Sequence, residues 1–237
     1  MVHRSPNYRD SQTNGSHRDA ISIDDIRDNI ASKMGFLRLK RAIDVAITLV
    51  AAPAILIVVG LACLMVLITS GRPVLYSQNR VGLNGRPFRI LKIRTMAPTT
   101  KVFMHATLEG DPRIIAGGQF LRDTHIDELP QFWNIFKGDM SIIGPRPEQV
   151  HLVEEYRKEI PLYELRHLVR PGLSGWSQLQ YGYAADLDQT RRKFEYDFYY
   201  VCSLGPKIDF KVAIGTLLRV FPLKNIHSKF LPSKPTS

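Results

Sequence analysis

The chain has 237 residues, with 32 basic and 22 acidic side chains and a formal charge of +10. This length leaves room for one domain with a substantial core plus an anchor, and the only cysteines, Cys63 and Cys202, argue against a disulfide framework and for a reducing compartment. The positive charge favours an anionic partner, without choosing among nucleic acid, lipid headgroups and phosphorylated small molecules.

Residues 1–35 form a polar N-terminal segment. Residues 1 to about 20 are rich in Ser, Asn, Arg and Asp and show no hydrophobic periodicity, so we expect a disordered tail. The segment contains no apolar signal core, and a cleavable signal peptide is therefore not expected. From Ser22, apolar residues recur at helical spacing through Leu37, which predicts a short amphipathic helix that rests on the domain or on lipid.

Residues 36–71 carry a strong membrane signal. No charged residue occurs between Val45 and Ser70, and about 20 helical residues are enough to cross a bilayer core. Pro53 lies inside this run, where it is expected to break or kink a helix. Basic residues flank both ends of the apolar run. Because positive charge collects on the cytoplasmic side of membrane segments, both ends are expected on that side. The pattern favours a re-entrant segment that returns at Pro53; a spanning helix stays open, and a buried helix of a soluble protein suits the length poorly.

Residues 72–222 are expected to form one folded domain, followed by a C-terminal tail at residues 223–237. Near the start of this domain, two β-like runs flank Asn84-Gly85, a dipeptide typical of tight hairpins. Such a hairpin is expected to present Arg89, Lys92 and Arg94 close together.

Asp127 and Glu128 are adjacent carboxylates in this basic chain. Pro130 follows them, and because proline is tolerated in the first turn of a helix, we expect a helix that starts at the pair and runs to about Phe136. Adjacent residues point about 100° apart on a helix, so the two carboxylates are expected to have different roles. Arg146, between two prolines, is a candidate phosphate ligand because its guanidinium can grip phosphate as a fork.

The remaining sequence is predicted to be mainly helical. Helical patterns cover about 149–167 and 186–197, and a strongly apolar helix follows Gly205-Pro206. This last helix is compatible with the headgroup zone of a membrane and equally with the protein core. The predicted fold class is α+β: a membrane-anchored, mostly helical domain with a small β-hairpin and a re-entrant membrane helix broken at Pro53.

Short motifs follow one another in a specific order. They are Lys92-Ile-Arg-Thr-Met96, Asp111-Pro-Arg-Ile114, Phe120-Leu-Arg122, Asp127-Glu-Leu-Pro-Gln131, Trp133-Asn134, Lys137-Gly-Asp-Met-Ser141, Gly144-Pro-Arg-Pro-Glu148 and Pro171-Gly-Leu-Ser-Gly-Trp176. The set resembles the bacterial sugar transferases that act as monotopic polyprenyl-phosphate phosphoglycosyltransferases and initiate exopolysaccharide, capsule and O-antigen assembly. The resemblance covers roughly 39–221, and it departs from the family at Ala52-Pro53, where members commonly carry Ser-Pro at the membrane break.

The resemblance implies transfer of a sugar 1-phosphate from a UDP-sugar to a polyprenyl phosphate, usually undecaprenyl phosphate, with UMP released and Mg²⁺ required. Asp127 would be the nucleophile that forms a phospho-sugar aspartyl intermediate. Glu128 would assist beside it, and either carboxylate is a candidate metal ligand. Lys92, Arg122 and Arg146 would contact the substrate phosphates. The implied location is the bacterial inner membrane, with the catalytic domain facing the cytosol.

Other interpretations stay open. Taken singly, Asp127 could cap a helix, Glu128 could pair with a nearby arginine, and Arg146 could be a surface charge. A membrane-anchored protein that binds a polyanion or scaffolds polysaccharide export is the alternative to an enzyme, and a single-step transfer with Asp127 only as a metal ligand is the alternative mechanism. The expected partners are the UDP-sugar, the polyprenyl phosphate and inner-membrane lipid, not nucleic acid; a homo-oligomer and polysaccharide assembly proteins are further candidates. The sequence does not identify the sugar.

Overall fold

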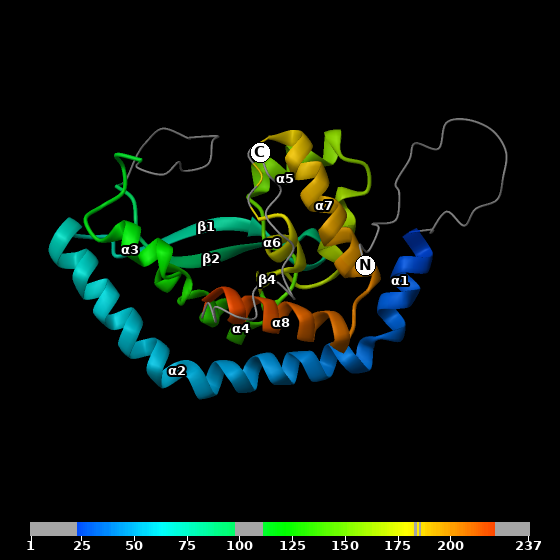
Figure 1. The fold of residues 1–237 in the computed structure, drawn as a ribbon, viewed down its shortest axis with the longest axis horizontal. Helices are drawn as coiled ribbons and strands as arrows, with labels where there is room; N and C mark the ends of the chain where they lie inside the picture. Colours follow the sequence, from blue (N-terminus) through cyan, green and yellow to red (C-terminus); the bar gives the residue numbers. More distant parts are fainter. Residues whose placement is uncertain (1–22, 98–110, 183, 185, 221–237) are drawn as a thin grey trace.

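The computed structural model describes residues 23–97, 111–182, 184 and 186–220. Over these ranges the fold is mostly helical, with two small two-stranded sheets (Figure 1). This arrangement agrees with the predicted mixture of many helices and a small hairpin. The predicted tails, residues 1 to about 20 and residues 223–237, lie outside the described residues.

Two consecutive helices form the N-terminal part. They are α1 (Ile23–Ser32) and α2 (Met34–Ser70), so the predicted amphipathic helix is divided at Lys33. Ile26 of α1 is buried in a cluster with Tyr200 of α7 (Leu187–Cys202). The much longer α2 curves along one side of the molecule (Figure 1), and it is long and apolar enough to cross a membrane.

Pro53 lies within α2 without ending it. The predicted break at Pro53 is therefore not present, and the helix passes through the proline within an overall curve (Figure 1). The alanines on both sides, Ala51, Ala52 and Ala54, have the highest helix propensity and favour continuation of the helix around the missing backbone N–H. Entry of α2 into one leaflet stays a prediction.

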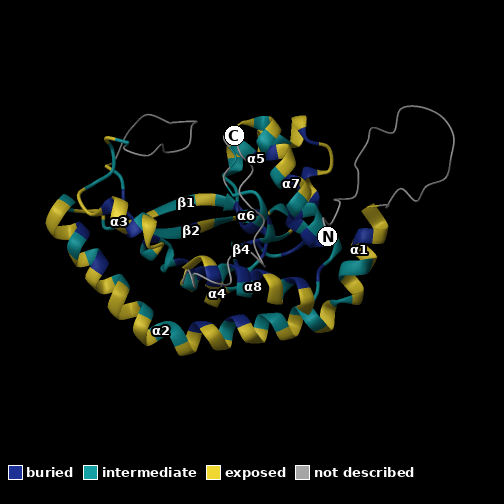
Figure 2. Cartoon of the chain, in the orientation of Figure 1, coloured by how far each residue is buried: buried dark blue, intermediate teal, exposed yellow. Residues whose placement is uncertain are grey.

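Helix α2 exposes large apolar side chains along its length. Val50, Leu56 and Ile68 keep 84%, 70% and 76% of their surface exposed, and exposed residues recur along the whole helix (Figure 2). A core helix of a soluble protein buries such residues. The exposure therefore argues against a buried core helix and favours an apolar environment around α2.

Both ends of α2 contact the same domain. Near its start, Lys40 forms an ion pair with Asp209 of α8 (Pro206–Val220). At its end, the carbonyl of Ser70 accepts a hydrogen bond from Arg94 Nη2 at 2.8 Å. The two ends of this apolar helix are thus anchored to one globular unit, on the inner side of the curve (Figure 1).

The predicted hairpin is confirmed. Strands β1 (Leu75–Val81) and β2 (Pro87–Ile93) pair antiparallel and are joined through η1 (Leu83–Gly85), a short 3-10 turn. Asn84 and Gly85 adopt left-handed conformations with φ of 54° and 75°. Asn and Gly tolerate this backbone region better than other residues, which is why this dipeptide marks the turn.

The basic residues of the hairpin do not form the expected cluster. Side chains alternate between the two faces of a strand, so Arg89 and Lys92, three positions apart, point to opposite faces. Arg89 donates to Ser77 on the neighbouring strand, and Arg94 is buried at the end of α2. Of the three, only Lys92 reaches the carboxylate pair.

Asp127 and Glu128 lie on a 3-10 turn, not in the first turn of a longer helix as predicted. Pro130 is the N-cap of the next helix, which starts after the pair. The preceding His125 has a left-handed backbone with φ of 56°, and this conformation separates the pair from the helix before it. The elements concerned are α3 (Gly118–Asp123), η2 (Ile126–Glu128) and α4 (Gln131–Lys137).

The C-terminal half packs helices around a second sheet, in which β3 (Ser141–Ile143) and β4 (Gly172–Ser174) are parallel. Its other elements are α5 (Val150–Glu159), η3 (Tyr163–Leu168), α6 (Trp176–Gln180), α7 and α8. Helix α8 buries Ile208 and Val212 and exposes Phe210 and Leu217. One face of the predicted last helix thus belongs to the core, while the other face stays open.

Candidate active site

The Glu128 carboxylate contacts two basic side chains, and the three residues come from separate parts of the chain. Its Oε1 accepts hydrogen bonds from Lys92 Nζ and Arg146 Nη2, both at 2.6 Å, and its Oε2 lies 3.3 Å from Arg146 Nη1. Only 14% of the Glu128 side chain and 18% of the Lys92 side chain are exposed. Buried, charge-assisted contacts of this kind are among the strongest hydrogen bonds in proteins.

Each of these residues lies on an element that restricts its position. Lys92 is on β2, opposite Tyr76 of β1, and Glu128 ends η2. Arg146 follows β3, and the prolines on both sides of it restrict the backbone of its loop, as the sequence predicted. Three of the five predicted site residues are therefore in direct contact, although they are distant in sequence.

Close backbone packing holds the loop that carries Arg146. A Cβ atom on Gly144 would lie 2.4 Å from the carbonyl oxygen of Arg170, and one on Gly172 would lie 2.1 Å from the Gly144 nitrogen. Such distances exclude every residue except glycine at these two positions. The approach of the two backbones presses the Arg146 loop against β4.

Asp127 differs from its neighbour. It is 8% exposed, and it forms no hydrogen bond or ion pair with any residue that the structure describes. Burial raises the pKa of Asp127 above its ordinary value; the charges of Lys92 and Arg122 oppose this shift, and Glu128 adds to it. Arg122, on α3, thus lies within electrostatic reach of Asp127 without forming an ion pair with it. Asp127 is the carboxylate of the pair that is available to an incoming group.

Glu128 has the opposite electrostatic character. Burial alone would raise the pKa of Glu128, but the charges of Arg146 and Lys92, with their hydrogen bonds, hold it well below its usual range. The pKa of Lys92 is lowered by burial and by Arg146, and Glu128 offsets only part of that shift. The two carboxylates thus have different surroundings, and the different roles expected of them stay a prediction.

A second layer of buried charges supports the Arg146 loop. Arg166 and Asp197, each 2% exposed, form an ion pair at 2.7 Å, and Arg166 Nη2 also donates to the carbonyl of Arg146 at 2.7 Å. Glu148, two residues after Arg146, pairs with Lys193 at 2.8 Å. No pattern in the sequence identifies these residues as a group. Glu148 belongs to a recognised motif, but no local pattern links residues on different elements.

The carboxylate oxygens of the pair are compatible with Mg²⁺ that binds together with substrate. Among residues 23–97, 111–182, 184 and 186–220, no group of three or more His, Cys, Asp or Glu side chains could hold a metal. Mg²⁺ usually binds one or two carboxylates plus substrate phosphates and water. Asp127 has no hydrogen-bond partner among the described residues and fits this requirement, whereas the Glu128 oxygens are engaged by Lys92 and Arg146.

Comparison with known proteins gives a consistent picture. A UDP-N-acetylgalactosamine-undecaprenyl-phosphate N-acetylgalactosaminephosphotransferase from Aeromonas hydrophila is 38% identical over 217 residues, which are 90% of this chain and 51% of the relative. A UDP-glucose:undecaprenyl-phosphate glucose-1-phosphate transferase from Escherichia coli (strain K12) is 38% identical over 187 residues, 77% of this chain and 40% of the relative. The exopolysaccharide production protein PSS of Rhizobium leguminosarum bv. phaseoli is 34% identical over 194 residues, 77% of this chain and 94% of the relative.

The chain thus spans about half or less of the first two relatives, and nearly all of the third. The family model described as bacterial sugar transferase matches residues 36–222. That match includes the apolar helix α2, the hairpin and all five predicted site residues. The chain belongs to the bacterial sugar transferase family.

Proposed function

We propose that this protein transfers a sugar 1-phosphate from a UDP-sugar to undecaprenyl phosphate, or a related polyprenyl phosphate, and releases UMP as the first membrane step of exopolysaccharide, capsule or O-antigen synthesis. The printed names of two relatives describe reactions of this type. The observation that carries the proposal is the pair formed by an unpartnered, buried Asp127 and a Glu128 that holds two cations beside it.

The proposed reaction has two displacements. In the first, an oxygen of Asp127 bonds to the β-phosphorus of the UDP-sugar, and the bond from this phosphorus to the bridging oxygen breaks, so that UMP leaves with that oxygen. In the second, an oxygen of the polyprenyl phosphate attacks the same phosphorus and releases Asp127. The lack of a hydrogen-bond partner for Asp127 within the described structure supports a role as nucleophile, because no bond must be broken before it attacks.

The basic residues offset the repulsion between an anionic nucleophile and an anionic diphosphate. Lys92 and Arg146 are held beside Asp127 by their common partner Glu128. Arg122 acts on Asp127 from α3. In this proposal the three cations contact phosphate oxygens, and Glu128 is the residue that positions two of them.

Mg²⁺ would be held by Asp127, with Glu128 adjacent, together with oxygens of the donor diphosphate. When bound there, it would neutralise negative charge on the diphosphate and on the departing UMP. Lys92, Arg122 and Arg146 would supply the remaining electrostatic stabilisation.

The fold supports a location at the surface of the bacterial inner membrane, with the catalytic domain in the cytosol. Ile126, which precedes Asp127, packs in one cluster with Ala62 and Val66 of α2. The carboxylate pair is thus attached to the apolar helix. Because both ends of α2 contact the same domain, we propose that its exposed middle dips into the inner leaflet, near the depth of the lipid phosphate.

The direct test is an assay of UMP release. The full chain in lipid nanodiscs is incubated with a panel of UDP-sugars, Mg²⁺ and undecaprenyl phosphate, and the same assay is run with Asp127→Asn and with Asp123→Asn. Asp123 is an exposed carboxylate on α3 that contacts Gln119, so its replacement is a matched control. We expect release with at least one donor, loss of release in Asp127→Asn, and normal release in Asp123→Asn.

Undiminished turnover by Asp127→Asn would exclude Asp127 as the nucleophile. Absence of release with every donor would instead support the non-catalytic alternative, a polyanion-binding or scaffold protein. A carboxylate pair inside the basic site speaks against that alternative, because it repels a polyanion.

A further inference from the structure

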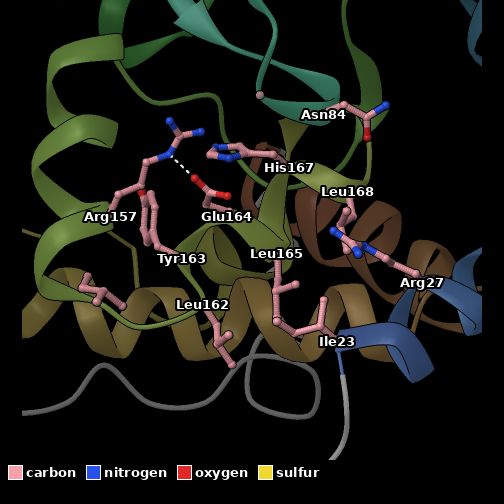
Figure 3. A pocket seen from close by; sticks show the side chains of 12 residues that line it. Ile23, Arg27, Asn84, Arg157, Leu162, Tyr163, Glu164, Leu165, His167 and Leu168 are labelled. Carbon is pink, nitrogen blue, oxygen red and sulfur yellow. Dashed lines mark ion pairs between the residues drawn. The ribbon is translucent and has the colours of Figure 1, made fainter.

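A cavity lies away from the carboxylate pair. Its volume is about 470 Å³, and its walls come from α1, α5, η3 and the hairpin turn (Figure 3). The turn residue Gly85 lines it, whereas Lys92 lies seven residues further along the hairpin. At about 3.3 Å per strand residue, this separation is roughly 23 Å. The cavity is therefore not part of the candidate active site.

Two arginines give the cavity a positive wall. Arg157 and Arg27 line it from α5 and α1. Arg157 Nε pairs with Glu164 at 2.7 Å, but 64% of the Glu164 side chain is exposed. Exposed ion pairs contribute little to stability, so an anion in the cavity can replace Glu164 as the partner of Arg157. Arg27 has a similarly exposed partner in Asp24, at 3.5 Å.

His167 is the polar group at the back of this cavity. It is 7% exposed, and neither ring nitrogen has a hydrogen-bond partner within the described structure. Figure 3 shows its imidazole beside the guanidinium of Arg157. Burial, followed by the charges of Arg166 and Arg157, lowers the pKa of His167 to about 3. The ring is therefore neutral at pH 7, with one donor and one acceptor unused.

A buried donor and a buried acceptor without hydrogen-bond partners lower the stability of the protein. The fold alone does not require this loss. The rest of the cavity wall is mixed, with the polar Asn84 and Glu164 beside an apolar part formed by residues such as Ile160, Leu162 and Leu165. A ligand that satisfies this surface needs an anionic group, a hydrogen-bonding atom and an apolar body.

We propose that this cavity is a binding site for a small organic phosphate, whose phosphate is held by Arg157, whose polar atom bonds to His167, and whose body lies against Ile160, Leu162 and Leu165. Phosphate matches the forked geometry of a guanidinium group. The site does not depend on the proposed transfer reaction.

The test is calorimetric titration of the full chain in detergent with phenyl phosphate, the smallest ring-bearing phosphate monoester, and with inorganic phosphate. We expect saturable binding of phenyl phosphate and at least tenfold weaker binding of inorganic phosphate, which lacks the apolar body. Arg157→Gln and His167→Leu are each expected to weaken phenyl phosphate binding at least about tenfold, a loss of about 1.4 kcal/mol.

His167→Leu also separates binding from folding. Because leucine removes two unsatisfied polar atoms from a site with a partly apolar wall, the variant is expected to keep or raise the thermal midpoint while it loses the ligand. The matched control is Arg146→Gln at the active site, which should leave phenyl phosphate binding intact. Absence of saturable binding in the wild type would overturn the proposal. So would loss of binding in Arg146→Gln with normal binding in His167→Leu, because the phosphate would then occupy the active site.

Discussion

Asp127 and Glu128 are adjacent in sequence, but their surroundings give them opposite energetics. Glu128 is stabilised as an anion by Lys92 and Arg146. Asp127 is buried without a hydrogen bond, and its raised pKa shows that the anion is disfavoured there. A carboxylate kept in such a place is expected to serve chemistry and to reduce stability, as is common for catalytic residues.

This contrast predicts opposite stability effects for two isosteric substitutions. Asp127→Asn should leave the free energy of unfolding unchanged or raise it at pH 7, because it removes a buried charge. Glu128→Gln should lower it by about 1 to 3 kcal/mol, because it leaves Lys92, 18% exposed, and Arg146, 32% exposed, without their counter-charge. Denaturant unfolding of the two variants in the same detergent measures both. A loss for Asp127→Asn as large as for Glu128→Gln would show that Asp127 has a structural partner.

A pH dependence follows from His167. The unfolded chain protonates this histidine near 6.5, whereas the folded pKa is about 3. Between these values the unfolded state binds more protons, so stability decreases as pH falls below about 6.5, by up to ~1.4 kcal/mol per pH unit. Unfolding measured at pH 6.5 and 5.5 should show this decrease in the wild type and in the exposed-site control His151→Gln. In His167→Leu the decrease should be smaller, and an unchanged slope would contradict the assignment.

At the scale of elements, a buried ion pair connects η3, α7 and the Arg146 loop. Arg166 and Asp197 satisfy each other only in part, since Arg166 Nε and Asp197 Oδ1 have no partner in the described structure. Buried pairs of this kind are weak stabilisers compared with well-packed apolar residues. The hydrogen bond from Arg166 to the carbonyl of Arg146 suggests that the pair positions the loop.

Single and double substitutions separate positioning from stability. Arg166→Met should destabilise the fold by about 3 to 5 kcal/mol, since Asp197 is left buried and unpaired. Arg166→Met combined with Asp197→Leu should recover most of that loss. If Arg166 positions Arg146, kcat of the double variant should stay about tenfold to a hundredfold low despite normal stability. Recovery of kcat together with stability would show a purely structural role.

The course of α2 makes a topological prediction. In a background of Cys63→Ser and Cys202→Ser, single cysteines are placed at Ser32, at Val50 and at Arg72, and are treated with a membrane-impermeant maleimide. Residues 32 and 72 should both react from the cytosolic side only, and residue 50 should react from neither side. Labelling of residue 72 from the opposite side would establish a spanning helix and would contradict a shared domain contact at both ends.

Local signals predicted individual elements well. Asn84-Gly85 identified the hairpin because the turn depends on the conformations of those two residues alone. Pro53 was expected to break or kink its helix. It does not end α2, and the re-entrant course of the segment stays a prediction. The pair Asp127 and Glu128 was placed in the first turn of the following helix, because Pro130 fits a first helical turn. In the structure Pro130 is instead the N-cap of α4, and the pair forms a separate turn before it.

At the scale of the whole molecule, the site is made by contacts between distant segments. The family motifs predicted that Lys92 and Arg146 share a site with Glu128. Pairing of Glu128 with an arginine was the alternative for that residue taken singly, and the structure shows it with Arg146, together with a contact to Lys92. Arg89 and Arg94 were grouped with Lys92 by sequence proximity. Strand alternation turns Arg89 to the opposite face, whereas Arg94 lies just beyond β2 and is buried at the end of α2. Likewise, the pairing of Arg166 with Asp197 depends on how η3 packs against α7, which no local pattern encodes.

The molecule as a whole attaches its reactive carboxylates to an apolar helix. Ile126, Ala62 and Val66 pack together, so movement of α2 relative to the membrane also moves Asp127. In the proposed function this attachment keeps the nucleophile near the lipid acceptor and within reach of a soluble donor. The mechanism then requires that the sugar phosphate remain on the protein between the two displacements.

Intact-protein mass spectrometry of a quenched reaction tests that requirement most directly. The full chain is mixed with its UDP-sugar and Mg²⁺ in the absence of polyprenyl phosphate. We predict a mass gain of one sugar phosphate, located on the peptide that contains Asp127, with an equal amount of UMP, and no gain in Asp127→Asn. UMP formed only after the lipid is added, with no adduct at any time, would contradict the covalent intermediate and establish a single-step transfer.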